Sequence, residues 1–455
     1  MEKENLKLKD DDFIKKLTSL IVPMTLQNFV FALIPVSDSL MLVALNQDAM
    51  SAVSLSAQIM MVLNLFLFGI TSGANMFAAQ YWGKGDKRSI ERVAAYSVFL
   101  TIPVMLLFFL AAILTPRALI SIYSNVPEII AYGESYLRVV SFAYIFMSLA
   151  MLFESVLKNT GFVKHCTVIS IISVFLNIAL NAVFIFGLLG APRMEASGAA
   201  LATTISNGFA CFSCLFLLVK KCSVKIRFKD IFSLDLGLRK DFSKYSAPYL
   251  ANQLLWGIGF TMISVIIGHL GSDATAANSI VFIIKDVVSC LCYALGGGGA
   301  IVVGNELGAN RFDTGKEYGD RILKIAIISG LILGILTALS TPIVVRFVNL
   351  SPVAIGYLKA MMYMNAYYIC GRSINCVVIG GILGAGGDTK FGFICDTLTM
   401  WAFIVPVGML AAFVWHLPVI VVYFILNLDE MIKIPVVLLH YKKYKWVKNI
   451  VNKVA

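Results

Sequence analysis

Charged side chains are scarce in this chain. Only 14 % of its 455 residues are Asp, Glu, Lys or Arg, whereas 59 % are hydrophobic, and the mean hydropathy is +0.85. Soluble domains carry about 25 % charged residues and about 45–50 % apolar ones. This balance excludes an ordinary water-soluble domain and indicates an integral membrane protein.

Signature motifs of enzymes and metal centres are missing as well. The sequence has no HExxH, GxSxG or GxxxxGKS/T motif, so the hydrolytic and nucleotide-binding chemistry of those motifs is not expected. Cys211 and Cys214 lie three residues apart, but no second cysteine pair or nearby histidine completes a metal site. We therefore interpret the cysteines as small apolar packing residues, and expect neither enzymatic activity nor an organic cofactor.

Long apolar runs are what the sequence does contain. A helix needs about 20 largely apolar residues to cross a hydrocarbon layer of about 30 Å, and twelve segments meet that requirement. The first of them continues without the small-residue cleavage site of a secretory leader, so we expect it to remain as a span. The expected spans are residues 17–43, 51–80, 93–115, 130–157, 165–189, 196–219, 243–269, 275–305, 322–345, 353–381, 392–414 and 417–440.

Positive charge is distributed unevenly around these runs. Most of the 37 Lys and Arg residues lie in the terminal segments, in alternate loops and in a long basic connection at 220–244, whereas the opposite loops hold only Arg117, Arg193 and Arg346. By the positive-inside rule, we expect both termini to be cytoplasmic in a multi-pass protein of the plasma membrane. This topology accounts for the net charge of +11, so no nucleic-acid partner is expected.

The two halves of the sequence repeat each other at one constant offset. The matched pairs are Pro23 with Pro248, Asp48 with Asp273, Gln80 with Asn305, and Gly161 with Gly386. Each half holds six expected spans, an even number, so the two repeats point the same way through the membrane. We predict an all-α membrane protein of twelve transmembrane helices in two parallel six-helix repeats. They form an N-lobe at 1–219, a cytoplasmic basic linker at 220–244 and a C-lobe at 245–455.

Ionisable residues inside a span cost about 2.5–3.5 kcal/mol each and so point to function. Asp38 follows the helix-disturbing Pro35, with no cation nearby in its segment. At 1.5 Å per residue, Asp38 lies about 8 Å below the outer surface. A similar depth is expected for Asn181 and Thr203, and for Asn177, which lies one helical turn from Asn181. A carboxylate, two amides and a hydroxyl suit H⁺ or Na⁺, and the alternative is that these groups only bridge helices.

A second set of ionisable residues lies in the other half. Lys285 and Asp286 fall near the middle of the eighth span, and Arg372 lies in the tenth. We expect them to face a substrate cavity between the halves, and structural ion pairs between helices are the alternative. Five further residues are expected close enough to the inner face to reach water: Glu154, Asp396, Asp429, Glu430 and Lys433.

These segments resemble the MATE (multidrug and toxic compound extrusion) family, in its bacterial NorM/DinF-like branch. The resemblance runs over almost the whole chain and rests on VSDSLM, AAQYWGKGD, NIALNAVFIFG, GNELGAN and GGILGAGGDTKF, in that order. It implies two lobes, alternating access, and multidrug efflux by antiport against inward H⁺ or Na⁺. It also places Asp38 on the family's span-one carboxylate, and Asn177 and Thr203 on polar partners in the N-lobe. Asn181 stands where some members have aspartate.

Two departures from the family pattern concern the C-lobe. Some members carry a glutamate in span seven, where this chain has Gln253 and Trp256 and no carboxylate. Others carry an aspartate early in span ten, where Ser373 stands beside Arg372. We therefore expect coupling through the N-lobe, and assign Gln253 and Trp256 to the substrate cavity with Lys285, Asp286 and Arg372.

The leading hypothesis is a monomeric secondary antiporter in the lipid bilayer that exports amphipathic or cationic small molecules, with H⁺ or Na⁺ as coupling ion. A flippase for lipid-linked saccharides, or an exporter dedicated to one metabolite, is the alternative within the same superfamily. Its expected sign is a group of cations in the cavity, for which Lys285 and Arg372 are candidates. An intramembrane enzyme or a receptor is disfavoured, because the sequence has no catalytic constellation and consists of two repeats with six expected spans each.

Overall fold

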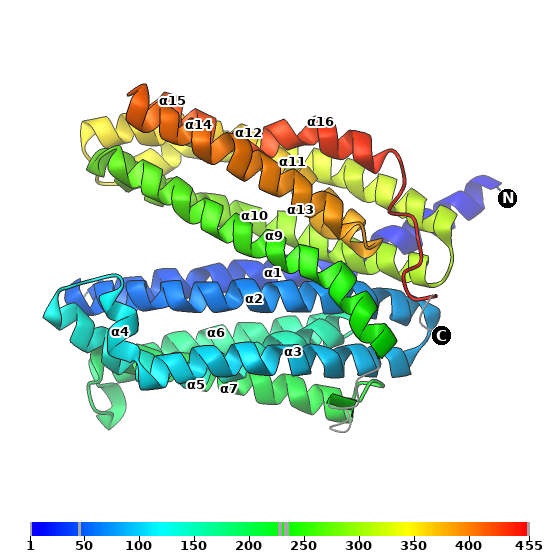
Figure 1. Cartoon of the computed structure of the whole chain (residues 1–455), viewed down its shortest axis with the longest axis horizontal. Coiled ribbons are helices and arrows are strands. Elements are labelled where there is room, and N and C mark those ends of the chain that lie inside the picture. The colour runs from blue at the N-terminus through cyan, green and yellow to red at the C-terminus, as the bar shows by residue number, and fades with distance from the viewer. Residues whose placement is uncertain (1, 44–46, 226–229, 232–235, 453–455) are drawn as a thin grey trace. The chain divides into compact units, whose positions relative to one another are not determined.

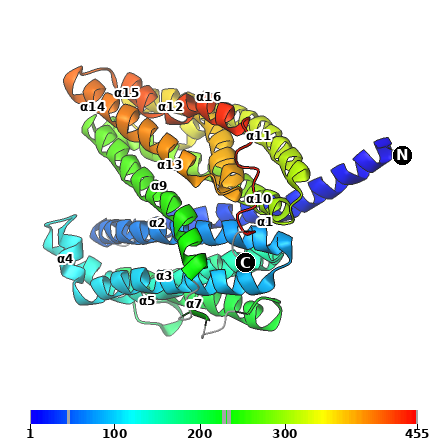
Figure 2. The same ribbon diagram turned by 45° about the vertical axis from the view of Figure 1, so that its right-hand side comes forward.

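The computed structural model describes residues 2–43, 47–225, 230–231 and 236–452, and within these ranges every regular element is helical (Figure 1). The helices of the first half are α1 (Glu2–Val43), α2 (Gln47–Lys84), α3 (Lys87–Leu114), the short α4 (Pro116–Ser121), α5 (Pro127–Asn159), α6 (Val163–Phe186) and α7 (Glu195–Lys220), with a 3₁₀ turn at Leu188–Gly190. In both views α5 runs beside α3 and beside α7 (Figure 2).

The second half begins with four long helices and continues in shorter pieces. Its helices are α9 (Leu236–His269), α10 (Ser272–Gly308), α11 (Phe312–Phe347), α12 (Pro352–Asn375), α13 (Thr389–Thr397), α14 (Val405–Met409), α15 (Val419–Leu426) and α16 (Asp429–Tyr441). Three π-helical segments, at Cys376–Leu383, Leu398–Ile404 and Leu410–Val414, extend or join α12, α13 and α14. The wider π turn is rare and is frequently found at functional sites.

Eleven helices in the described part of the chain are long and apolar enough to cross a membrane. The predicted all-α membrane class is confirmed. The twelfth predicted span, 417–440, is present as two helices end to end, because α15 ends at Leu426 and α16 begins at Asp429. Because segment 417–440 is expected to cross the membrane, the backbone and polar side chains at this break need partners within the protein.

The described residues form two compact units. Leu26–Ser246 makes the first unit. The chain up to Thr25, together with the part from Ala247 onward, makes the second unit. The first turns of α1 thus pack with second-half helices, and the first turns of α9 with first-half helices. The predicted lobe boundaries stay a prediction, as does the cytoplasmic location of the linker, of which 226–229 and 232–235 lie outside the described residues.

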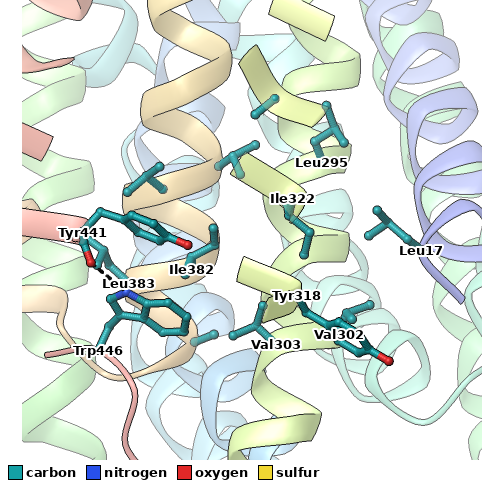
Figure 3. Close-up of a cluster of buried hydrophobic side chains, with 14 of the residues drawn as sticks. Leu17, Leu295, Val302, Val303, Tyr318, Ile322, Ile382, Leu383, Tyr441 and Trp446 are labelled. Carbon is teal, nitrogen blue, oxygen red and sulfur yellow. Dashed lines mark hydrogen bonds between the residues drawn. The ribbon is translucent and has the colours of Figure 1, made fainter. Parts of the chain in front are cut away.

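A buried apolar cluster joins the start of α1 to helices of the second half (Figure 3). Leu17 lies in this cluster with Ile322 of α11 and with Trp446, whose side chain is fully buried. The Trp446 ring stacks on Tyr441 with 5.6 Å between ring centroids, and its Nε1 donates to the Tyr441 carbonyl at 3.3 Å. Burying such aromatic side chains fixes the C-terminal segment against the second unit.

Gly386, one of the repeated glycines, lies against the backbone of Trp446, so we predict that Gly386→Ala is destabilising. An added Cβ would collide with the Trp446 carbonyl group, and overpacking of this kind costs about 1–3 kcal/mol. Gly356→Ala is the matched control, because that glycine lies inside α12 with open space around its Cβ position. Thermal unfolding of the purified proteins should show a lower midpoint for Gly386→Ala alone, and equal midpoints would contradict this packing.

Candidate functional site

The four residues proposed for the N-lobe site lie together inside the first unit. Asn181 of α6 donates from Nδ2 to Oδ1 of Asp38 on α1, with 2.6 Å between these atoms. The same nitrogen lies 3.3 Å from Oδ1 of Asn177. Asn177 in turn donates from Nδ2 to the Thr203 hydroxyl of α7 at 3.3 Å. A continuous polar chain therefore connects three helices.

Close packing of α6 against α7 positions this chain. Gly198 of α7 lies so near the Phe184 carbonyl of α6 that a side chain there would collide with it. Buried Ala199, Ala200 and Ala202 follow Gly198 on α7. Small residues allow two helix backbones to approach closely within a membrane. The approach brings the i,i+4 amide pair of α6 within reach of the α7 hydroxyl.

Oxygen atoms dominate the chemistry of this cluster. Asn177, Asn181 and Thr203 are 2 %, 0 % and 8 % exposed, so water has little access to them. The Asn181 Oδ1 atom is buried and has no hydrogen-bond partner. Carboxylate, amide and hydroxyl oxygens are ligands for hard cations such as Na⁺, and the carboxylate alone also binds a proton. The described residues contain no group of three His, Cys, Asp or Glu side chains that would favour a transition metal.

A second polar cluster in the first unit surrounds Glu154. Gln27 of α1 donates from Nε2 to Glu154 at 2.9 Å and to the Ser170 hydroxyl at 2.7 Å, and Lys158 pairs with the same carboxylate at 2.9 Å. The expectation that Glu154 simply reaches water is wrong, because its side chain is 12 % exposed and held by three partners. Gln27, 1 % exposed, was not identified from the sequence, since a neutral amide in an apolar run carries no charge signal.

In the second unit, Glu430 is the centre of a buried ion network. Its Oε1 accepts from Arg372 at 2.8 Å, and its Oε2 accepts from Asn375 at 2.8 Å. Lys433 lies 3.4 Å from Glu430 and 2.9 Å from Asp396. The expectation that the α16 residues reach water is wrong. Asp429, Glu430 and Lys433 are 4 %, 2 % and 5 % exposed.

Lys285 has a different environment from the other buried cations. Its Nζ donates to the amide oxygen of Asn427 at 3.1 Å and lies 3.3 Å from the centroid of the Tyr368 ring. Within the described residues no carboxylate lies within ion-pair distance of it. Asn427 occupies the break between α15 and α16, so the interrupted twelfth span supplies the acceptor for this ammonium group.

Of the remaining residues assigned to the substrate cavity, Trp256 lies beside Arg372. The Arg372 guanidinium carbon lies 5.2 Å from the Trp256 ring centroid and 5.3 Å from that of Tyr293, and Nη2 of Arg372 donates to the Tyr293 hydroxyl at 2.7 Å. Gln253 lies half-buried on α9, and Asp286 is exposed and makes no ion pair with Lys285. Arg372 thus makes the interhelical ion pair that was the alternative. That these residues line a substrate cavity stays a prediction.

Comparison with known proteins matches both halves of the chain to one family. The model of the MatE family matches residues 23–183 and 248–410, one segment in each half. The probable multidrug resistance protein NorM of Thermotoga maritima is 23 % identical over 444 residues, which cover 96 % of this chain and 94 % of that protein. The uncharacterized transporter YisQ of Bacillus subtilis is 24 % identical over 406 residues, 88 % of either chain.

Solved structures show the same fold. A MOP superfamily transporter from Pyrococcus furiosus superposes with a TM-score of 0.85 at 18 % identity, over 94 % of this chain and 95 % of that one. The two segments that match the family model begin at Pro23 and Pro248, the paired prolines of the internal repeat. Because the family model covers most of the sequence, the chain belongs to the MATE (multidrug and toxic compound extrusion) family.

Proposed function

We propose that this protein is a secondary active antiporter of the plasma membrane that exports amphipathic or cationic small molecules in exchange for inward H⁺ or Na⁺. Membership of the MATE family and the multidrug-resistance names of its NorM relatives support the substrate class. The observation that carries the coupling site is the 2.6 Å hydrogen bond between Asn181 and Asp38. Both termini are cytoplasmic and the working unit is a monomer in this proposal.

Asn181 gives the site two distinguishable states. With Asp38 ionised, the amide NH₂ faces the carboxylate, and the amide oxygen stays buried without a partner. An ionised carboxylate repels the amide oxygen of Asn181. A Na⁺ ion between the two groups, or a proton on the Asp38 carboxyl, would remove this repulsion and favour the orientation in which the amide oxygen faces Asp38. Rotation of the Asn181 amide by 180° exchanges the positions of its oxygen and nitrogen, so cation binding changes which of these atoms makes a hydrogen bond or contacts the cation.

Coupling follows if the two states favour different packing of the helices that carry them. The polar chain links α1, α6 and α7, so a change at Asp38 acts on three helices at once. A ligand shifts a conformational equilibrium only by its difference in affinity for the two states. A cation bound at Asp38 would favour one arrangement of the transporter, and bound substrate would favour the other arrangement. Movement of the substrate outward is then coupled to movement of the cation inward.

The direct test uses full-length protein in sealed liposomes, with a pH gradient or a Na⁺ gradient imposed separately. We expect one of the two gradients to drive the cationic dye ethidium against its own concentration gradient. Empty liposomes and ionophore-treated proteoliposomes are the controls. Dye movement that is unaffected by collapsing both gradients would contradict coupled antiport, because a passive pore needs no driving cation.

A second candidate is favoured by one observation in the second unit. Lys285 has a neutral amide and an aromatic ring as its contacts and no ion-pair partner within the described residues. Such an ammonium group suits an anionic substrate, such as a lipid-linked saccharide phosphate or an acidic metabolite. In the same liposomes, transport of an anionic amphipath but not of ethidium would favour this candidate.

A further inference from the structure

A hydrophobic groove lies between α6 and α7, within the first unit and away from the Asp38 cluster. Its volume is about 700 Å³, within the range of about 300–1,000 Å³ that is typical of ligand pockets. Apolar residues of both helices form its walls, and two basic residues lie at one end. The lining residues are Lys164, His165, Val168, Ile169, Phe209, Phe212, Ser213, Phe216 and Leu217.

The walls of this groove are exposed apolar side chains. Val168 is 54 % exposed, Phe212 62 % and Phe216 58 %. The groove follows α7 from Phe209 to Phe216, about two helical turns, or roughly 10 Å. Exposed apolar side chains on a membrane-spanning helix face the acyl chains of lipids. A groove of this length and lining is therefore suited to one hydrocarbon chain lying along the helix pair.

The basic end of the groove coincides with the start of α6. Val163, Lys164 and His165 form the first turn, and no side chain caps the helix. The first N–H groups of a helix have no partner within it, and the helix dipole adds partial positive charge there. Phosphate groups bind at such termini. The exposed Lys164 ammonium group adds a full positive charge at the same place.

We propose that this groove binds one anionic phospholipid of the cytoplasmic leaflet. The phosphate would lie at the uncapped α6 terminus beside Lys164 and His165, with an acyl chain along Phe209, Phe212 and Phe216. Basic pockets between membrane helices on the cytoplasmic side bind anionic headgroups in other membrane proteins. The predicted orientation puts this end of α6 on the cytoplasmic side.

Native mass spectrometry of the full-length protein tests this assignment with phosphatidylglycerol and phosphatidylethanolamine of identical acyl chains. We expect the wild type to retain phosphatidylglycerol in preference. Loss of a basic residue that lies beside the bound headgroup weakens anionic-lipid binding about fivefold, so Lys164→Gln, which removes a charge from the groove lining, should lower the preference by that factor. Lys220→Gln is the matched control, because it removes one exposed positive charge at the same end of α7 without lining the groove.

Ser213→Phe provides an independent variant, since the larger side chain would fill the groove without changing its charge. We expect this variant to lose binding of both lipids while its thermal unfolding stays close to that of the wild type. Equal retention of the two lipids by the wild type would overturn the proposal. So would a Lys220→Gln effect as large as that of Lys164→Gln, or unchanged lipid binding in Ser213→Phe.

Discussion

Asp38→Asn is expected to abolish cation-driven efflux while leaving the protein folded. Asparagine has nearly the same shape as aspartate and can still accept the hydrogen bond from Asn181, so the contact among α1, α6 and α7 survives. It carries no negative charge, however, and neither binds a proton at neutral pH nor attracts Na⁺ as a carboxylate does. The coupling free energy between two binding sites is typically about 1–3 kcal/mol, or about 5–150-fold in affinity. In Asp38→Asn, the coupling between cation and substrate should disappear completely.

The measurement is the initial rate of dye efflux under an imposed cation gradient, for equal amounts of reconstituted protein. Glu128→Gln serves as the matched control, because it also removes one carboxylate from the first unit, at an exposed position at the start of α5. We expect the control to transport at the wild-type rate. Normal gradient-driven transport by Asp38→Asn would place the coupling site elsewhere.

Glu430→Gln is expected to lower the stability of the second unit strongly. Glu430 is 2 % exposed and is the shared partner of Arg372, Asn375 and Lys433. Removing one member of a buried ion pair costs about 3–5 kcal/mol, because the opposite charge is left buried without compensation. The thermal unfolding midpoint of the purified variant should therefore fall by many degrees.

Glu317→Gln is the control for this prediction. Glu317 makes an i,i+4 ion pair with Arg321 on α11, but its side chain is 42 % exposed, and such surface pairs contribute about 0–1 kcal/mol. A double variant, Glu430→Gln with Arg372→Gln, should recover part of the loss, because it removes the uncompensated cation as well. An unfolding midpoint of Glu430→Gln within the range of the Glu317 control would show that the network does not stabilise the fold.

The helical membrane fold was predictable because its main determinants are local. The length of each apolar run sets the number of spans, and the constant offset between Pro23 and Pro248 reveals the duplication without any knowledge of packing. The proximity of Asp38, Asn181 and Thr203 was predicted from depth alone. That estimate succeeded because the three helices are adjacent and continuous, so residues at equal depth meet. Their role as cation ligands stays a prediction.

The C-lobe network was not predictable by the same reasoning. Counting residues along an unbroken span at 417–440 put Glu430 and Lys433 near the inner face. The helix instead stops at Leu426 and restarts at Asp429, and the side chains after the break turn into the second unit. The sequence Asn-Leu-Asp-Glu at 427–430 was the available signal, since two acids after an asparagine are costly inside an apolar run. Which cations compensate them depends on helix packing, and no local pattern specifies that.

The assignment of Asp38 as the coupling site is tested most directly by measuring cation movement that the substrate itself drives. Proteoliposomes without any cation gradient would receive an outward gradient of transported dye, with a pH indicator or a Na⁺ indicator in the external medium. For the wild type we expect the dye gradient to drive H⁺ or Na⁺ in the opposite direction. For Asp38→Asn we expect no cation movement although the dye still binds. Cation movement by Asp38→Asn at the wild-type ratio to dye would contradict the account.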